Sequence, residues 1–189
     1  MKLSDDIRIE ASREKVYQAL NDPDILRQAI PGCEELERIS DTEFAGTVRT
    51  KVGPVSARFK GSVVLSDLNP PESYTITGEG KGAASFTKGH ANISLSEEGG
   101  ATILKYDVDV AIGGKLAQLG SRLIEGTAKR LAGEFFNNLQ GLLGVPAGQA
   151  ATGSPERREP AAGRTINWVW IIAGAALLAA VIFGLFMRG

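Results

Sequence analysis

The sequence predicts an α+β fold: a curved antiparallel sheet of about seven strands around one long helix, two short helices, and a separate C-terminal membrane helix. Three observations predict it. Apolar and polar residues alternate over much of residues 44–112, which is typical of strands with one buried face. The period becomes helical over residues 115–143. Residues 166–187 then carry no charge for about 22 positions, enough to cross a hydrocarbon core of about 30 Å.

The first thirty residues predict one strand and two short helices. The apolar side chains of the first ten positions share one parity and indicate a strand that ends near Ile9. Ser12 is placed to cap a short helix, and Pro23 follows an aspartate at the start of a second one. Pro31-Gly32 ends that second helix.

The central part of the chain predicts the remaining strands. Strict alternation covers residues 44–52, 55–65 and 104–112, with weaker strands at Glu34–Ser40 and Glu72–Gly82. Turn signals such as Gly53-Pro54 separate these runs. Between Phe86 and Ile93 the apolar pattern slips by one position, so we expect a bulge or a bend near Gly89.

The last part of this domain predicts a long helix over residues 115–143, about 43 Å long at 1.5 Å per residue. Gly120, Gly126 and Gly133 interrupt it, and a glycine inside a helix costs about 1 kcal/mol relative to alanine. A curved sheet cannot close tightly on one helix everywhere, so we expect a cavity between them. Glycines on the helix and the strands would leave room for it. Alternatively, the strand glycines mark bulges and coiling of the sheet.

Composition divides the chain into three parts. Residues 1–143 form the predicted folded domain, residues 144–165 a flexible linker rich in Pro, Gly and Ala, and residues 166–187 a transmembrane helix. As a coil the linker reaches roughly 25 Å, and fully extended about 75 Å. The alternative for this segment is a mere spacer.

The arginines near the apolar run predict its orientation. Three arginines precede the run and only Arg188 follows it. The side of a membrane span with more Lys and Arg tends to lie in the cytoplasm, so the main domain is expected to be cytoplasmic. The chain is therefore expected to be a single-pass protein of the cell membrane. A GPI-type signal is the alternative interpretation of an apolar tail, but the first residues show no secretory signal.

Composition also excludes several functions. With 21 basic and 22 acidic side chains, the net charge of −1 gives no attraction to nucleic acid and argues against a polybasic contact with anionic lipid. Cys33 and His90 are the only residues of their kinds, so no internal disulfide and no plausible catalytic constellation is expected. We expect no metal site either, because Asp107 and Asp109 alternate on a strand and should face solvent.

Three stretches of the chain are similar to the G-subunit family of carbon monoxide dehydrogenase. They are Asn21–Ile39, Thr50–Gly82 and Gly113–Leu139, which contain the motifs IPGCE, KVGPV and GGKLAQLGSRLI. The resemblance covers roughly residues 1–143. That family belongs to the START-like helix-grip superfamily, whose fold matches the one predicted above.

The resemblance implies an accessory role. Family members accompany molybdenum-containing carbon monoxide dehydrogenases and their relatives in the xanthine-oxidase group, and recruit them to the cytoplasmic membrane. The resemblance also implies a hydrophobic cavity suited to a quinone. The resemblance therefore implies no covalently bound cofactor, and menaquinone or ubiquinone as a carried ligand.

Two sets of residues are candidates for binding. The predicted cavity lining is Phe59, Phe86, Tyr106, Leu116, Leu119 and Leu123. For each of them ordinary core packing is the alternative, and the Tyr106 hydroxyl would suit a ligand carbonyl. The turn Pro31-Gly32-Cys33 is the predicted partner contact, as a docking edge or lid hinge, with a purely structural turn as the alternative.

The residues and the resemblance together leave three classes of function. The first is an adaptor that holds a cytoplasmic dehydrogenase at the membrane, and the second is a carrier of a lipophilic quinone. These two are compatible. The third, an enzyme, lacks a plausible acid–base group. A general hydrophobic-ligand or lipid-binding START-like protein without a dehydrogenase partner remains the alternative to the first two.

Overall fold

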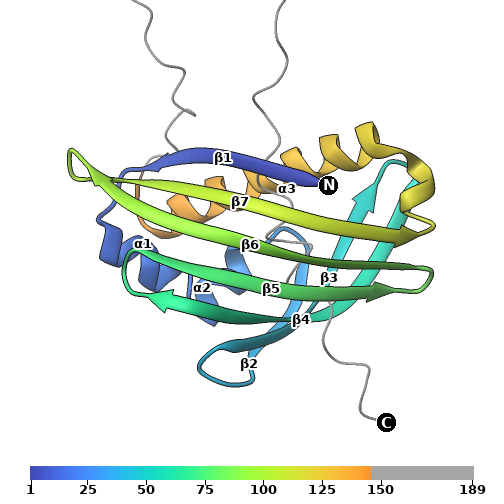
Figure 1. The fold of residues 1–189 in the computed structure, drawn as a ribbon, viewed down its shortest axis with the longest axis horizontal. Coiled ribbons are helices and arrows are strands. Elements are labelled where there is room, and N and C mark those ends of the chain that lie inside the picture. The colour runs from blue at the N-terminus through green and yellow to red at the C-terminus, as the bar shows by residue number, and fades with distance from the viewer. Residues whose placement is uncertain (146–189) are drawn as a thin grey trace, which may run out of the picture.

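The computed structural model describes residues 1–145, which contain one seven-stranded antiparallel sheet (Figure 1). The predicted linker beyond Val145 and the predicted span at residues 166–187 lie outside the described residues. The strand order is β1-β7-β6-β5-β4-β3-β2. The strands are β1 (Lys2–Ile9), β2 (Cys33–Arg38), β3 (Glu43–Val52), β4 (Val55–Asn69), β5 (Ser73–Gly82), β6 (Ser85–Glu98) and β7 (Ala101–Gly114).

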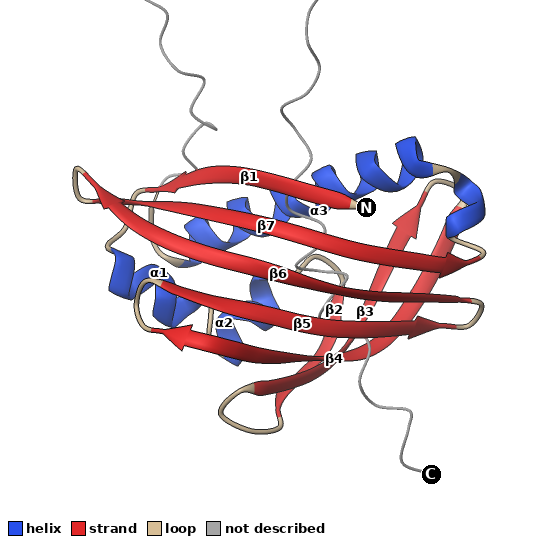
Figure 2. Cartoon of the chain, viewed as in Figure 1, coloured by secondary structure: helices blue, strands red, loops and turns tan. Residues whose placement is uncertain are grey.

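Three α-helices accompany the sheet and lie on the same side of it (Figure 2). They are α1 (Arg13–Ala19), α2 (Pro23–Ala29) and α3 (Ser121–Leu142). The predicted starts of the two short helices are confirmed. The Ser12 hydroxyl accepts a hydrogen bond from the Lys15 amide at 3.4 Å, and the carboxylate of Asp22 accepts one from the Asp24 amide at 2.8 Å. Within residues 1–145, no helix combines the length and the apolar character that a membrane span requires.

The core lies between the inner face of the sheet and these helices. Fully buried side chains come from both layers: Ile9 on β1, Val48 on β3, Leu104 on β7, Val16 on α1 and Leu139 on α3. The strand positions follow the predicted alternation, because every second side chain of a strand points to the same face.

The long C-terminal helix is shorter than predicted. Gly120 adopts a φ of 85°, which ends a short 3₁₀ turn, η1 (Ala117–Leu119), before α3 begins at Ser121. A residue with this φ cannot continue a right-handed helix. Leu123, a predicted cavity residue, does not lie on the buried face of α3. Ala128, Ala132 and Phe136 are buried, whereas Leu123 and Leu142 are 39% and 40% exposed.

Of the bulge or bend predicted near Gly89, the bulge is wrong. Strand β6 pairs with both neighbours without a register shift, and Gly89 faces Gly78 on β5 and Val110 on β7. The apparent phase slip arises because Phe86 points to the outer face, where it lies across from Gly113 of β7. A Cβ atom on Gly113 would overlap the Phe86 ring, so the ring covers the glycine backbone.

Candidate functional site

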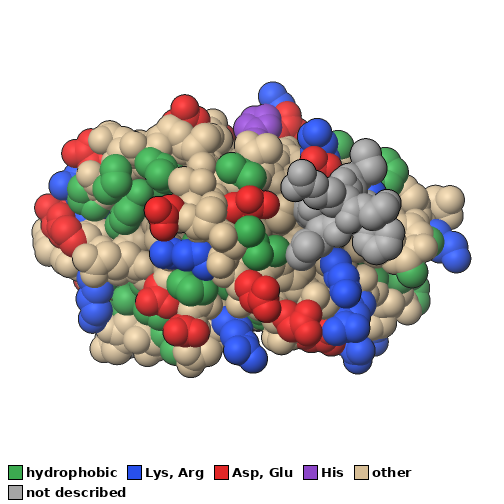
Figure 3. All heavy atoms as spheres, turned by 90° about the horizontal axis from the view of Figure 1, so that it is seen from below, with side chains coloured by type: hydrophobic (Ala, Val, Ile, Leu, Met, Phe, Trp, Pro, Cys, Tyr) green, Lys and Arg blue, Asp and Glu red, His purple; other side chains and the backbone are tan. Residues whose placement is uncertain are grey.

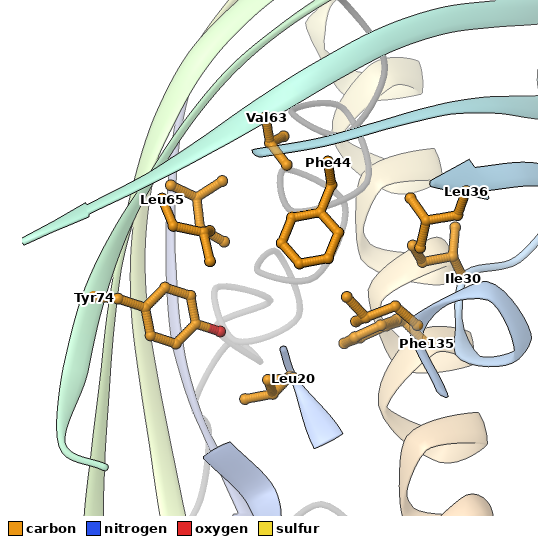
Figure 4. Close-up of a pocket in the computed structure, with 10 residues that line it drawn as sticks. Leu20, Ile30, Leu36, Phe44, Val63, Leu65, Tyr74 and Phe135 are labelled. Carbon is orange, nitrogen blue, oxygen red and sulfur yellow. The ribbon is translucent and has the colours of Figure 1, made fainter. Parts of the chain in front are cut away.

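An apolar pocket lies between the short helices, α3 and the inner face of the sheet (Figure 4). Its volume is about 50 Å³. Ten residues line it: Leu20, Leu26, Ile30, Leu36, Phe44, Val63, Leu65, Tyr74, Ile76 and Phe135. Nine of these ten side chains are purely hydrocarbon, so the pocket favours an apolar occupant.

Each wall of the pocket follows from local structure. The apolar face of α2 supplies Leu26 and, just after its end, Ile30. The inward positions of β3, β4 and β5 supply the sheet side. Phe135 of α3 closes the back, and α2 is held against α3 by a hydrogen bond from the Asn138 side-chain amide to the Ala29 carbonyl at 3.1 Å.

Tyr74 is the one polar side chain among the ten lining residues. Its side chain is 3% exposed, and Figure 4 shows its hydroxyl pointing into the pocket. Burial raises the pKa of Tyr74, and the neighbouring Tyr17 raises it further, so the group stays a neutral hydroxyl at physiological pH. Tyr17 packs edge-on against it at 5.6 Å between ring centroids. Tyr74 therefore offers a hydrogen-bond donor in an apolar surrounding.

The pocket is small for a ligand of ring size. Pockets that enclose drug-sized ligands usually measure about 300–1,000 Å³. A volume of about 50 Å³ holds water-sized groups. A ring-shaped ligand would require movement of the lining. Leu20, Leu26 and Ile30 line the pocket from outside the sheet, at the end of α1 and on and just after α2.

None of the six predicted lining residues belongs to this pocket. Tyr106 and Leu116 are buried elsewhere in the core, as is Phe59, which packs against the backbone of Gly82. Leu119 is half-buried. The remaining two, Phe86 and Leu123, are 52% and 39% exposed. The alternation of β3 and β4 contains the missed residues Phe44, Val63 and Leu65, but does not indicate which part of the sheet borders a pocket.

Tyr106 forms a second buried polar point. Its side chain is 2% exposed and stacks on Phe136 of α3, with 5.9 Å between the ring centroids. Its hydroxyl has no hydrogen-bond partner among the described residues. Burial raises the pKa of Tyr106, and the charge of Asp5, its partner across β1 and β7, adds to the rise. The hydroxyl is therefore neutral and available to a ligand or a water molecule.

Substituting Tyr106 with phenylalanine tests this unpaired hydroxyl. A buried polar group without a partner costs about 1–3 kcal/mol, so Tyr106→Phe is expected to raise the free energy of unfolding by about 1 kcal/mol in ligand-free protein. Urea unfolding followed by circular dichroism measures the change. A loss of stability would show that the hydroxyl has a partner in solution.

The turn Pro31-Gly32-Cys33 lies beside the pocket, because Ile30 before it and Leu36 after it both line the cavity. Gly32 has a φ of 75°, and its carbonyl accepts a hydrogen bond from the Arg49 amide at 2.8 Å. Cys33 is half-buried, and burial raises the pKa of its thiol. These contacts tie the turn to β3. Its role as a partner contact stays a prediction.

The part of the chain that the structure describes contains no cluster of three or more His, Cys, Asp or Glu side chains able to hold a metal ion. His90 is exposed on the outer face of β6, across from Asp109. Cys33 lies at the start of β2, at the far edge of the sheet. The structure therefore does not bring the two together, and the pocket's chemistry is that of apolar binding with one hydroxyl.

Comparison with known families identifies the group to which this domain belongs. The family model for the G-subunit of carbon monoxide dehydrogenase (CoxG) matches residues 6–144. The chain belongs to the CoxG family. The predicted resemblance, placed at residues 1–143, is therefore confirmed. No match was found among curated proteins.

Solved structures support the fold of this CoxG family member. A conserved protein from Geobacillus kaustophilus is 28% identical, with a TM-score of 0.73, over 76% of this chain and 95% of that chain. A START superfamily protein from Mycobacterium smegmatis is 16% identical, with a TM-score of 0.58, over 76% of this chain and 97% of that chain. The described domain thus has a START-like fold, which is compatible with a ligand-binding accessory protein.

Proposed function

We propose that this protein recruits a molybdenum-containing carbon monoxide dehydrogenase, or a related dehydrogenase of the xanthine-oxidase family, to the cytoplasmic membrane. It also binds a lipophilic quinone, menaquinone or ubiquinone, and so links the enzyme to the respiratory chain. The family supports the partner, and the apolar run at residues 166–187 supports a membrane tether with the main domain on the cytoplasmic side. The protein itself contributes no catalysis.

The observation that carries the quinone proposal is the apolar pocket with a single inward hydroxyl, that of Tyr74. A quinone head is a flat apolar ring with carbonyl acceptors, and its isoprenoid chain is hydrocarbon. The nine hydrocarbon side chains suit the ring and chain, and the Tyr74 hydroxyl suits one carbonyl. Tyr106, whose hydroxyl has no partner among the described residues, does not line this pocket and is the alternative donor only if the ligand lies elsewhere in the core.

The two tyrosines can be tested separately. Menadione, which has the menaquinone ring without its chain, is titrated into the full-length protein in detergent and binding is followed by native mass spectrometry. Tyr74→Phe removes one hydroxyl from the pocket, and loss of one hydrogen bond is expected to weaken binding about fivefold. Tyr106→Phe is the matched control and should bind as the wild type does.

Three outcomes would count against this assignment. Unchanged binding in Tyr74→Phe together with weakened binding in Tyr106→Phe would move the donor to Tyr106. Absence of menadione binding in the wild type would remove the quinone proposal. A phospholipid that copurifies in place of quinone would favour the general lipid-binding alternative.

The tether is tested by deleting residues 146–189 in the native host. The dehydrogenase is expected to move from the membrane fraction to the soluble fraction, because the only apolar run long enough to span a bilayer has been removed. Activity assays on both fractions measure the shift. An unrelated membrane helix fused after residue 165 should restore membrane recovery. A dehydrogenase that stays in the membrane fraction after the deletion would contradict the adaptor role.

A further inference from the structure

The outer face of the β3–β4 hairpin is basic in the half near its tip. Arg49 and Lys51 are outward positions of β3, and Arg58 and Lys60 are outward positions of β4. Lys81 of β5 extends the row, because it pairs with Lys60. All five side chains are exposed. We call these five residues the basic hairpin face. The view in Figure 3 shows Lys and Arg side chains gathered towards the right-hand end of the molecule.

This face places like charges directly opposite one another. Arg49 pairs with Arg58, and Lys60 pairs with Lys81. Like charges at directly opposed strand positions destabilise a sheet. Glu34, on β2, forms ion pairs with both arginines, with 3.2 Å between its carboxylate and the Arg49 guanidinium. One carboxylate shared by two arginines leaves that pair with a net positive charge, which an anionic partner would relieve.

The hairpin ends in a small apolar edge beside these cations. Pro54 at the tip is exposed, and Val55 is half-buried. Leu123, in the first turn of α3, lies against this tip, because a Cβ atom on Gly53 would come within 2.6 Å of its Cδ2. Leu123 itself is 39% exposed. Cations next to exposed apolar groups are the combination found where proteins rest on a membrane surface.

The net charge of the whole chain conceals this arrangement. On the far strands of the sheet, acidic and basic side chains face each other: Lys2 of β1 pairs with Asp109 of β7, and Asp6 pairs with Lys105. The strand order separates β1 from β3 by four strands. Glu35 and Glu37 of β2 and Glu43 of β3 also lie at outward positions, further from the hairpin tip. The excess of basic side chains is therefore confined to the half of the hairpin near its tip, although the total charge is −1. A charge near zero does not exclude a local polybasic contact.

We propose that the basic hairpin face rests on an anionic lipid bilayer, with its lysines and arginines at the phosphate groups and Pro54 and Leu123 at the headgroup boundary. The inference rests on the proposed membrane attachment through residues 166–187. The 20 residues from 146 to 165 span up to about 70 Å when extended, which is long enough for this face to reach the same surface. The exposed apolar edge favours a bilayer over an acidic protein surface.

Spin labelling of the full chain in vesicles tests this contact. The native Cys33 is replaced by serine, and a nitroxide is placed at position 56 by Ser56→Cys, since Ser56 is exposed and pairs with Lys51. The control label is Ser94→Cys, which is exposed on the outer face of β6. Vesicles contain either phosphatidylcholine alone or phosphatidylcholine with phosphatidylglycerol. Collision with a water-soluble nickel complex reports exposure to water.

The label at position 56 is expected to lose several-fold in nickel accessibility in the phosphatidylglycerol vesicles, and the label at position 94 to stay unchanged. Salt at about 0.5 M, where the screening length is about 4 Å, should reverse the effect. The double variant Lys51→Gln, Lys60→Gln should also reverse it, because each basic side chain removed weakens partition to an anionic surface roughly fivefold.

Flotation of the same samples separates this inference from the proposed attachment. Protein that floats with both vesicle types but shows equal accessibility at position 56 overturns the lipid contact and leaves the tether intact. Protein that floats only with phosphatidylglycerol vesicles supports the contact and contradicts the tether. Protein that floats with neither overturns both. Protection of position 56 by added dehydrogenase, without any effect of lipid charge, would assign the face to an acidic protein instead.

Discussion

Substitution of Phe135 by alanine is expected to lower the free energy of unfolding by about 3–5 kcal/mol. Phe135 is 3% exposed and closes the back of the pocket from α3. Its ring also packs edge-on against the Phe136 ring, with 5.0 Å between the ring centroids. Such aromatic pairs stabilise the fold beyond the burial of their apolar surface. The same change removes one wall of the pocket, so small apolar ligands should have a larger cavity to occupy than in the wild type.

Chemical denaturation of the full chain in detergent measures this effect as a shift of the urea midpoint at constant slope. Leu142→Ala is the matched control, because Leu142 belongs to the same helix but is 40% exposed. The control should lose less than about 1 kcal/mol, as most exposed positions do. A similar small loss for Phe135→Ala would mean that α3 does not pack on the short helices as described.

Replacement of Gly32 by alanine is the second change with a large expected effect. At a φ of 75° an L-residue loses about 1–2 kcal/mol to backbone strain. A Cβ atom at this position would also overlap the carbonyl oxygen of Arg49, which belongs to the sheet and cannot move alone. The total loss of stability is expected to exceed about 2 kcal/mol, with displacement of the turn beside the pocket.

Gly126→Ala serves as the comparison for this prediction. Gly126 lies in α3, is exposed, and a Cβ atom there would meet nothing within 4 Å. Alanine in that place should raise stability by up to about 1 kcal/mol, because it favours the helix and restricts the unfolded chain. Thermal unfolding of both variants measures the expected loss of stability in Gly32→Ala and the expected gain in Gly126→Ala. A neutral Gly32→Ala variant would show that the turn is loose in solution.

Much of the fold can be predicted from the sequence because strand alternation and helix capping are local signals. The parity of Val63 and Leu65 on β4 identifies the inner face without any knowledge of the neighbouring strands. Phe86 is different, since its outward position is explained only by Gly113 on the paired strand. The start of α3 depends on the positive φ of Gly120. A glycine inside a helical pattern does not by itself indicate that its φ is positive.

The candidate site is harder to predict for a tertiary reason. The apolar face of α2, with Leu26 and Ile30, is evident in the sequence, but that it closes a pocket against β5 depends on how α2 packs on α3. Tyr74 belongs to a strand with a weak pattern, in which glycines occupy several inward positions. Its inward hydroxyl therefore has no local signal. Tyr106 has the predicted inward parity, yet it lies on a different part of the core from the pocket.

The end of α3 bears on how the domain responds to mechanical load. The Lys15 ammonium donates a hydrogen bond to the Leu143 carbonyl at 2.8 Å, which fastens the last turn of α3 to α1. Tension that arrives along the backbone at Val145 is thus shared between two helices. Leu20 ends one of them and Phe135 belongs to the other, and both are walls of the pocket. A pull on the C-terminal end would strain two walls of the same cavity at once.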